Sequence, residues 1–168
     1  MSDRPYPRAF SHVGITVTDL DRAVEWYRSV LGCTLLMGPL EIDAGDTPIG
    51  RLCTDIFGDR FQKMRLAHMS TGNYIGLELF EFKQPKSERR ADNFEYWKNG
   101  FFHICVTDPN IEALSQRIAE SGGKHRSQIW ELFPGSGYRM TYCEDPFGNI
   151  IEIYTHGYEQ TYSNRSGY

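Results

Sequence analysis

Apolar positions in the first part of the chain change from an alternating to a helical spacing. Residues 12–17 read His-Val-Gly-Ile-Thr-Val, and this alternation predicts a strand. Asp19 then precedes apolar residues spaced three and four apart, so it is the predicted N-cap of a helix that ends at Gly32. The apolar stripe of this helix consists of Leu20, Ala23, Val24, Tyr27, Val30 and Leu31.

Apolar runs later in this half predict more strands. They lie at residues 33–37, 63–69 and 74–82. Residues 38–60 are rich in Gly, Asp and Pro, and we expect an irregular segment there with one short helix around residues 52–57. A long insertion in a compact domain is often a lid or a binding loop. Residues 83–99 are polar and charged, which predicts a linker that carries a loose helix.

The second half of the chain repeats this order. Strands are predicted at residues 101–106 and near residues 126–132, 138–143 and 149–155, and Asn110 is the predicted cap of a helix that Gly122-Gly123 closes. In both halves 20 positions separate a histidine of the first strand from the closing glycine, His12 to Gly32 and His103 to Gly123. This self-similarity predicts an α+β fold of two paired βαβββ modules that form an open, barrel-like cleft.

The repeat gives a predicted domain organisation. It comprises an N-terminal tail (1–9), a first βαβββ module (10–82, with the insertion 38–60), a linker (83–99), a second βαβββ module (100–156) and a C-terminal tail (157–168). The tail from Gly157 is polar, and we expect it to be loosely ordered.

Composition excludes several classes of function. The net charge of −4, from 18 basic and 22 acidic residues, is unlike the basic footprint of a nucleic-acid-binding protein. No apolar run approaches the roughly 20 residues that cross a bilayer. The first ten residues contain no apolar signal core, so we expect a cytoplasmic protein. None of the four cysteines forms a Cys-x-x-Cys pair, which argues against a zinc ribbon or a dithiol redox motif.

Strand alternation places four polar side chains on one side of the predicted sheets. Because Val13, Ile15 and Val17 should pack under the first helix, His12 should face the cleft, and His103 should do so in the second module. Leu77 and Leu79 flank Glu78 as Ile151 and Ile153 flank Glu152, so both glutamates should also face the cleft. The predicted site is therefore His12, Glu78, His103 and Glu152.

Two imidazoles and two carboxylates suit one divalent metal ion, such as Zn, Ni, Fe, Mn or Co. Two waters would complete an octahedral site, and open positions would make it catalytic rather than structural. A single strand histidine is ordinarily a core residue, and a single strand glutamate ordinarily faces solvent. Their recurrence at equivalent positions of two repeats favours the metal site.

Three motifs resemble one protein family. Residues 12–20 (HVGITVTDL) with 26–32 (WYRSVLG) resemble the opening of vicinal oxygen chelate proteins, 102–106 (FHICV) resemble their second-module opening, and 145–152 (DPFGNIIE) are similar to their closing turn and strand. This group includes glyoxalase I, methylmalonyl-CoA epimerase, extradiol dioxygenases, and fosfomycin and bleomycin resistance proteins. The resemblance spans roughly residues 8–156 and implies ligands at the same four positions.

The resemblance implies that the metal holds neighbouring substrate oxygens and stabilises an enolate. The first hypothesis is a glyoxalase-type lyase or isomerase acting on a small carbonyl or hydroxy-carbonyl compound, with Glu152 or Glu78 as the general base. The second is an Fe(II)-dependent extradiol-type dioxygenase with two histidine ligands and one carboxylate. The third is a non-enzymatic drug-binding and resistance protein.

Aromatic residues near the predicted site suggest how substrate binds. Phe80, Phe82 and Tyr154 should face the cleft and Arg139 lies nearby in sequence, so these four are the candidate substrate-binding residues. An apolar or aromatic carbonyl compound would fit them, and an ordinary core role for the aromatic side chains is equally open. We expect a small-molecule substrate, no nucleic acid or membrane partner, and a homodimer whose modules pair within one chain or swap between two.

Overall fold

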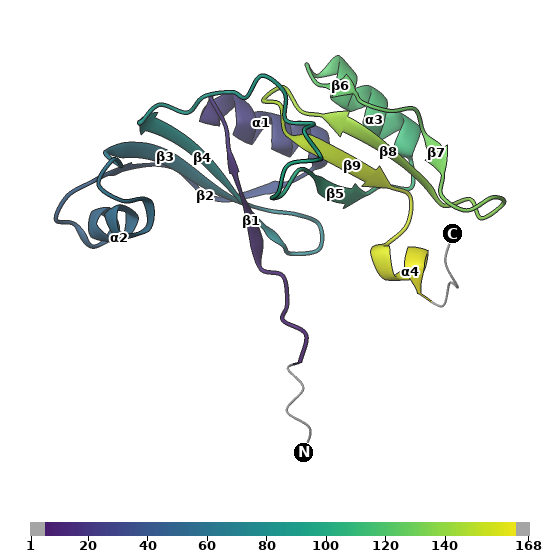
Figure 1. Cartoon of the computed structure of the whole chain (residues 1–168), viewed down its shortest axis with the longest axis horizontal. Coiled ribbons are helices and arrows are strands. Elements are labelled where there is room, and N and C mark those ends of the chain that lie inside the picture. The colour runs from purple at the N-terminus through teal and green to yellow at the C-terminus, as the bar shows by residue number, and fades with distance from the viewer. Residues whose placement is uncertain (1–5, 164–168) are drawn as a thin grey trace. The chain divides into compact units, whose positions relative to one another are not determined.

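The structure, a computed structural model, describes residues 6–163 and divides the chain into two compact units. The N-terminal unit is Met1–Glu88 and the C-terminal unit is Arg89–Tyr168. Figure 1 shows their helices and strands. Parts of both expected tails, residues 1–5 and 164–168, lie outside the described residues. No helix among the described residues is long and apolar enough to cross a membrane.

The N-terminal unit is a four-stranded sheet with two helices. Its elements are β1 (His12–Thr16), α1 (Leu20–Leu31), β2 (Thr34–Asp43), α2 (Pro48–Phe57), β3 (Lys63–Ser70) and β4 (Gly76–Gln84). The strand order is β1-β4-β3-β2, with β1 parallel to β4 and the other neighbours antiparallel. The strand β4 that carries Glu78 therefore has a hydrogen-bonded neighbour on each side.

Helix α1 forms as the sequence predicts. The Asp19 side chain accepts a hydrogen bond from the backbone N–H of Arg22, which satisfies one of the free donors at the helix start. Gly32 ends the helix at φ 70°, a left-handed conformation that favours glycine. The apolar stripe of α1 is buried except for the half-buried Leu31, Trp26 is buried as well, and the helix packs against β2, β3 and β4. This packing leaves the opposite face of the sheet for other contacts.

The C-terminal unit repeats this topology. Its elements are β5 (Ile104–Thr107), α3 (Ile111–Glu120), β6 (Lys124–His125), β7 (Trp130–Glu131), β8 (Arg139–Glu144), β9 (Ile150–Tyr154) and α4 (Tyr158–Tyr162). The strand order is β5-β9-β8-β6, β5 is parallel to β9, and β7 pairs with β8. All five residues of β9 are buried. The predicted α+β class and the predicted repeat of βαβββ units are confirmed.

The segment after α1 differs from the prediction. Strand β2 continues to Asp43 instead of ending at residue 37, and α2 begins at Pro48, so residues 38–60 are not an irregular loop. The prediction rested on the Gly-, Asp- and Pro-rich composition of this segment, but β2 is an edge strand and tolerates Pro39, which has no N–H to donate. The pairing of β2 with β3 shifts register between Leu35 and Leu40, which accommodates the proline locally.

Other predicted elements also change. The loose helix expected within residues 83–99 is wrong, because β4 extends to Gln84 and the following residues form turns. The strand expected at residues 126–132 is replaced by the short strands β6 and β7. Strand β5 starts at Ile104, so His103 directly precedes it. A short helix, α4, forms where a loose tail was expected.

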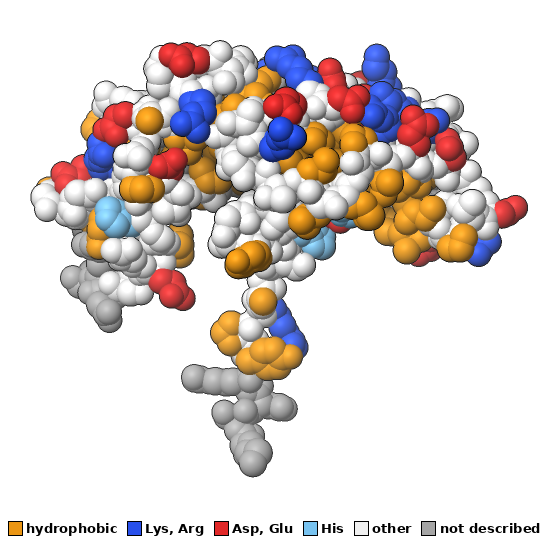
Figure 2. Space-filling view, turned by 180° about the vertical axis from the view of Figure 1, so that it is seen from behind, with side chains coloured by type: hydrophobic (Ala, Val, Ile, Leu, Met, Phe, Trp, Pro, Cys, Tyr) orange, Lys and Arg blue, Asp and Glu red, His pale blue; other side chains and the backbone are white. Residues whose placement is uncertain are grey.

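Helix α2 packs on the sheet face opposite α1 (Figure 1). Its Cys53 belongs to a buried cluster with Ile42, Phe61, Met64 and Leu66, against which Phe80 and Phe82 also pack. The outer side of α2 remains apolar and exposed. Figure 2 shows apolar side chains at the surface of this region, where the exposed residues are Ile49, Leu52 and Ile56.

Candidate functional site

Strand register gives the two glutamates equivalent surroundings. Glu78 of β4 lies opposite Gly14 of β1 on one side and opposite His68 of β3 on the other. Glu152 of β9 lies opposite Cys105 of β5 and Tyr142 of β8. His12, two positions before Gly14, lies near Glu78. His103, two positions before Cys105, lies near Glu152 in the same way. The repeat inferred from the sequence thus extends to individual side chains.

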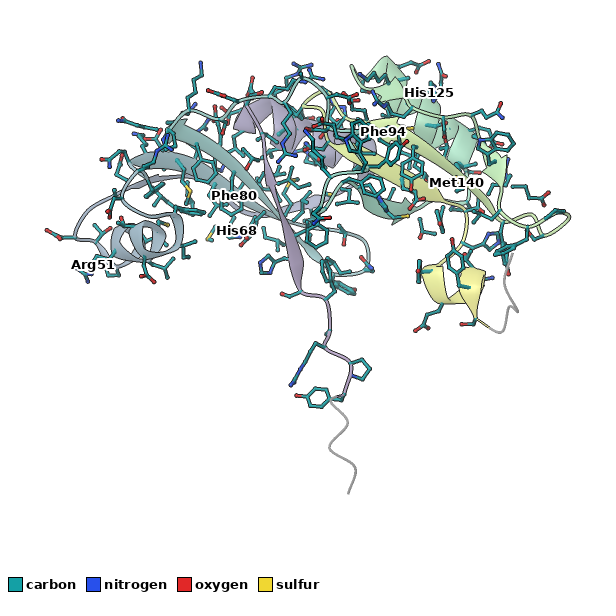
Figure 3. The ribbon with its side chains drawn as sticks, in the orientation of Figure 1. Arg51, His68, Phe80, Phe94, His125 and Met140 are labelled. Atoms are coloured by element: carbon teal, nitrogen blue, oxygen red, sulfur yellow. The ribbon has the colours of Figure 1, made fainter. Side chains whose placement is uncertain are left out.

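In the N-terminal unit, two histidines flank Glu78. Nε2 of His12 lies 3.6 Å from Oε2 of Glu78, and Nδ1 of His68 lies 3.4 Å from Oε1. The exposed fraction of the side chain is 53% for His12 and 26% for Glu78. Figure 3 shows His68 on the sheet face that also carries Phe80. This half of the candidate site is open to solvent and carries two nitrogen donors.

In the C-terminal unit, Glu152 is more enclosed. Its Oε2 lies 3.3 Å from Nε2 of His103, and only 8% of its side chain is exposed. Burial and a hydrogen bond to the Glu152 carboxylate raise the pKa of the Tyr142 phenol, so this hydroxyl stays protonated. Desolvation and then the charge of Glu152 raise the pKa of the Cys105 thiol, although part of that residue reaches solvent. Glu152 is therefore surrounded by neutral donors.

Charge pairing distinguishes Glu152 from the other buried glutamates. Glu81 pairs with Arg65 and Lys83 at 3.4 and 2.5 Å. Glu144 pairs with three basic groups, the nitrogen atoms of Arg89, Lys124 and Arg126, each at 3.1 Å. Among the described residues, the ion-pair partner of Glu152 is His103, and no lysine or arginine accompanies it. A buried carboxylate without a permanent positive partner is costly unless a cation binds.

The donor atoms present fit a divalent metal ion. Imidazole nitrogens and carboxylate oxygens are common ligands of Zn, Mn, Fe, Co and Ni. Nδ1 of His103 is buried and has no hydrogen-bond partner within residues 6–163, so one polar atom of this ring is left unsatisfied. The described part of the chain contains no group of three or more His, Cys, Asp or Glu residues that could hold a metal ion. Each unit on its own thus offers one histidine–glutamate pair of the predicted set.

The predicted substrate-binding residues are divided between the two units. Phe80 and Phe82 lie on the Glu78 face of the N-terminal sheet, where they pack against α2. Tyr154 lies on the Glu152 face, and its hydroxyl is 2.7 Å from that of Tyr162 in α4. The Arg139 guanidinium forms an ion pair with Glu112 of α3 instead, so it points to the helix side of its sheet. Arg139 therefore does not lie beside Glu152, as the prediction required.

Sequence reasoning missed two neighbours of the glutamates, His68 and Tyr142. Both lie on the strand antiparallel to the glutamate strand, directly across from it. Side chains two positions apart lie on the same face of a strand, so His68 shares its face with Met64 and Leu66, and Tyr142 shares its face with Met140. Alternation along β3 and β8 would therefore have placed both residues on the cleft face. Tyr162 had no comparable signal, because it depends on a helix in a segment expected to be loose.

Comparisons with known proteins show which proteins share this fold. A curated 2-epi-5-epi-valiolone epimerase from Actinomyces sp. is 28% identical over 158 residues, which cover 91% of this chain and 83% of that protein. A glyoxalase family protein from Bacillus cereus has a similar solved structure, with a TM-score of 0.72, 20% identity, and coverage of 92% of this chain and 97% of that one.

A fosfomycin resistance protein, FosX, from Listeria monocytogenes, solved with Mn(II) and dihydroxypropylphosphonic acid, shares the fold. It gives a TM-score of 0.59 at 13% identity and covers 93% of this chain and 98% of that one. The family model described as Glyoxalase/Bleomycin resistance protein/Dioxygenase superfamily matches residues 9–153. The predicted resemblance is confirmed, and the chain belongs to this superfamily.

Proposed function

We propose that this protein is a metal-dependent isomerase of the glyoxalase type, which epimerises a small hydroxy-carbonyl compound at the carbon beside its carbonyl group. The Actinomyces relative named as an epimerase supports an isomerase rather than a lyase. The observation that carries the proposal is the enclosure of Glu152, which is buried beside His103 with neutral donors around it. Such a carboxylate is well suited to bind a cation.

We propose His12, Glu78, His103 and Glu152 as the ligands of one divalent metal, supplied by one chain or by two. The histidine–glutamate pair in each unit supports this set, since both pairs arise at equivalent strand positions. The FosX structure with Mn(II) supports a divalent ion in a protein of this fold. When bound, the metal would act as a Lewis acid that makes the C–H beside a carbonyl group more acidic.

The chain's own residues would move the proton. One of Glu78 and Glu152 would accept it from the substrate carbon as a general base, and the other would deliver a proton to the opposite face of that carbon as a general acid. His12 and His103 would orient the carboxylates, to which they lie within 3.6 and 3.3 Å. The hydroxyl of Tyr142, kept protonated by burial and by Glu152, would donate a hydrogen bond in this half of the site.

Metal analysis and isotope exchange test the proposal. The purified protein should contain about one Mn, Zn, Co or Ni per proposed site. With 2-epi-5-epi-valiolone in D2O, it should incorporate deuterium beside the carbonyl as epimer forms. Glu78→Gln and Glu152→Gln should each lower kcat about 100-fold or more, the usual size of a general-base contribution. Glu41→Gln, at an exposed glutamate of β2, should retain full activity.

Other outcomes separate the alternatives. Oxygen uptake with a catechol after anaerobic iron loading would show a dioxygenase instead. Tight small-molecule binding with neither product nor metal would show a binding protein. Parental activity in Glu152→Gln would refute the role proposed for this residue.

A further inference from the structure

Helix α2 is the main element that the two units do not share. In the C-terminal unit, the connection between β6 and β8 contains only the two-residue strand β7. In the N-terminal unit, the corresponding connection between β2 and β3 contains α2, which packs on the Glu78 face. Since the repeat otherwise holds, α2 makes the surroundings of Glu78 different from those of Glu152.

Phe57, the last residue of α2, contacts two aromatic rings of β4. Its ring centroid lies 6.3 Å from that of Phe80 and 5.2 Å from that of Phe82, both edge-on, and it also meets Phe61 at 5.5 Å. Phe80 and Phe82 stack on each other with centroids 6.0 Å apart. The helix therefore holds Phe80 in place from one side.

On its other side, Phe80 lies across β1 at Gly14. A Cβ atom at Gly14 would lie 3.2 Å from Cε2 of Phe80, closer than most real contacts. A glycine inside a strand often marks such an approach of another group. Because Gly14 is the register partner of Glu78, the Phe80 ring covers the position on β1 that neighbours this glutamate.

The equivalent aromatic residue of the C-terminal unit behaves differently. Tyr154 follows Glu152 as Phe80 follows Glu78, two positions along the strand. Its hydroxyl pairs with Tyr162 at 2.7 Å, and Cys105, the register partner of Glu152, carries a side chain and stays partly exposed. The register partner of Glu78 is thus a glycine covered by the Phe80 ring, whereas the register partner of Glu152 is a cysteine with a side chain of its own.

We propose that Phe80, held by Phe57, determines specificity by limiting the size of the substrate group that lies beside Glu78. This inference rests on the proposed function and names its substrate class more closely. The substrate is a compact hydroxy-carbonyl compound without an extended apolar chain on the side of Glu78. Such a chain would have to occupy the space that the Phe80 ring fills.

A series of hydroxamates tests this inference by binding rather than turnover. Acetohydroxamate, butyrohydroxamate and hexanohydroxamate present the same two neighbouring oxygens to a metal and differ in chain length. Calorimetric titration of the full-length protein loaded with Mn(II) should show affinity falling as the chain grows. In Phe80→Leu and Phe57→Leu, the affinity for hexanohydroxamate should rise about tenfold, while that for acetohydroxamate stays unchanged.

Phe61→Leu is the matched control. The Phe61 ring packs on the same Phe57 ring, with centroids 5.5 Å apart, whereas the ring contacts of Phe80 are with Phe57 and Phe82, so this replacement loosens the cluster without enlarging the space at Gly14. The Phe61→Leu protein should bind the three hydroxamates with the same dependence on chain length as the parent. The inference is overturned if Phe80→Leu keeps that dependence, or if Phe61→Leu relaxes it equally. If no variant binds Mn(II) or any hydroxamate, the proposed function itself fails, and this inference with it.

Discussion

Replacing Glu152 by glutamine should stabilise the metal-free protein and remove most of its stabilisation by metal. The carboxylate is 8% exposed and has His103 as its ion-pair partner. Burial of a carboxylate without a permanent cation costs several kcal/mol, of which hydrogen bonds from neutral donors recover about 1–2 kcal/mol each. Glutamine keeps the shape and one acceptor oxygen without the charge. We therefore expect the free energy of unfolding in chelator to rise by about 1 kcal/mol.

In the presence of metal, the parent should become more stable than Glu152→Gln. At a free metal concentration of 100 times Kd, the parent should gain about 3 kcal/mol from binding the folded state. The variant has lost one of the proposed ligands, so its gain should be far smaller. Urea titrations in EDTA and in excess Mn(II) measure both effects, and a change of about 1 kcal/mol corresponds to a Tm shift of about 2–4 °C.

Glu144→Gln is the control within the same unit. Its carboxylate is equally buried but pairs with Arg89, Lys124 and Arg126, so its loss should cost about 1–3 kcal/mol in both conditions. The reasoning about Glu152 is refuted if Glu152→Gln is less stable than the parent in EDTA, or if metal stabilises both proteins equally.

Three other variants test the fold around the site. Asp19→Ala removes the cap of α1 and should lower the free energy of unfolding by about 1 kcal/mol, whereas an unchanged urea midpoint would mean that water replaces the cap. Gly32→Ala should cost about 1–2 kcal/mol because its φ is 70°, and equal stability would contradict the conformational argument. Burial raises the pKa of Cys143 from 9.0 to about 11. The pKa of this thiol is thus higher in the folded protein than in the unfolded chain. The thiol therefore stabilises the folded state fully below about pH 9, and this stabilisation is lost as the pH rises towards about 11. Cys143→Ala should therefore lose less stability than the parent between pH 8 and pH 10.5 in urea titrations at several pH values, and parallel curves would refute this.

The local elements with strong patterns could be read from the sequence. Helix α1 has an aspartate cap, a continuous apolar stripe and a closing glycine, and the structure matches each of them. The repeat placed Glu78 and Glu152 at equivalent positions because strand alternation is strict where one face is buried by a helix. The histidine–glutamate pairs follow from the same rule.

The predictions that were wrong concerned features that depend on contacts between residues distant in sequence. The length of β2 is set by its pairing with β3, which local composition around Pro39 does not reveal. The direction of Arg139 is set by Glu112 on α3, 27 residues earlier. The place of α2 on the Glu78 face depends on the fit of Phe57 against Phe80 and Phe82. None of these partners can be identified from periodicity.

Both glutamates lie where their strands are paired on each side. Strands β4 and β9 each have a parallel neighbour on one side and an antiparallel neighbour on the other. The Cα atoms of Glu78 and Glu152 therefore cannot shift without breaking a ladder of hydrogen bonds. Any displacement of either carboxylate has to come from rotation about its own side-chain bonds, which takes picoseconds to nanoseconds when a side chain is free to turn. The groups proposed to carry the proton would thus move by side-chain rotation on a backbone that stays in place.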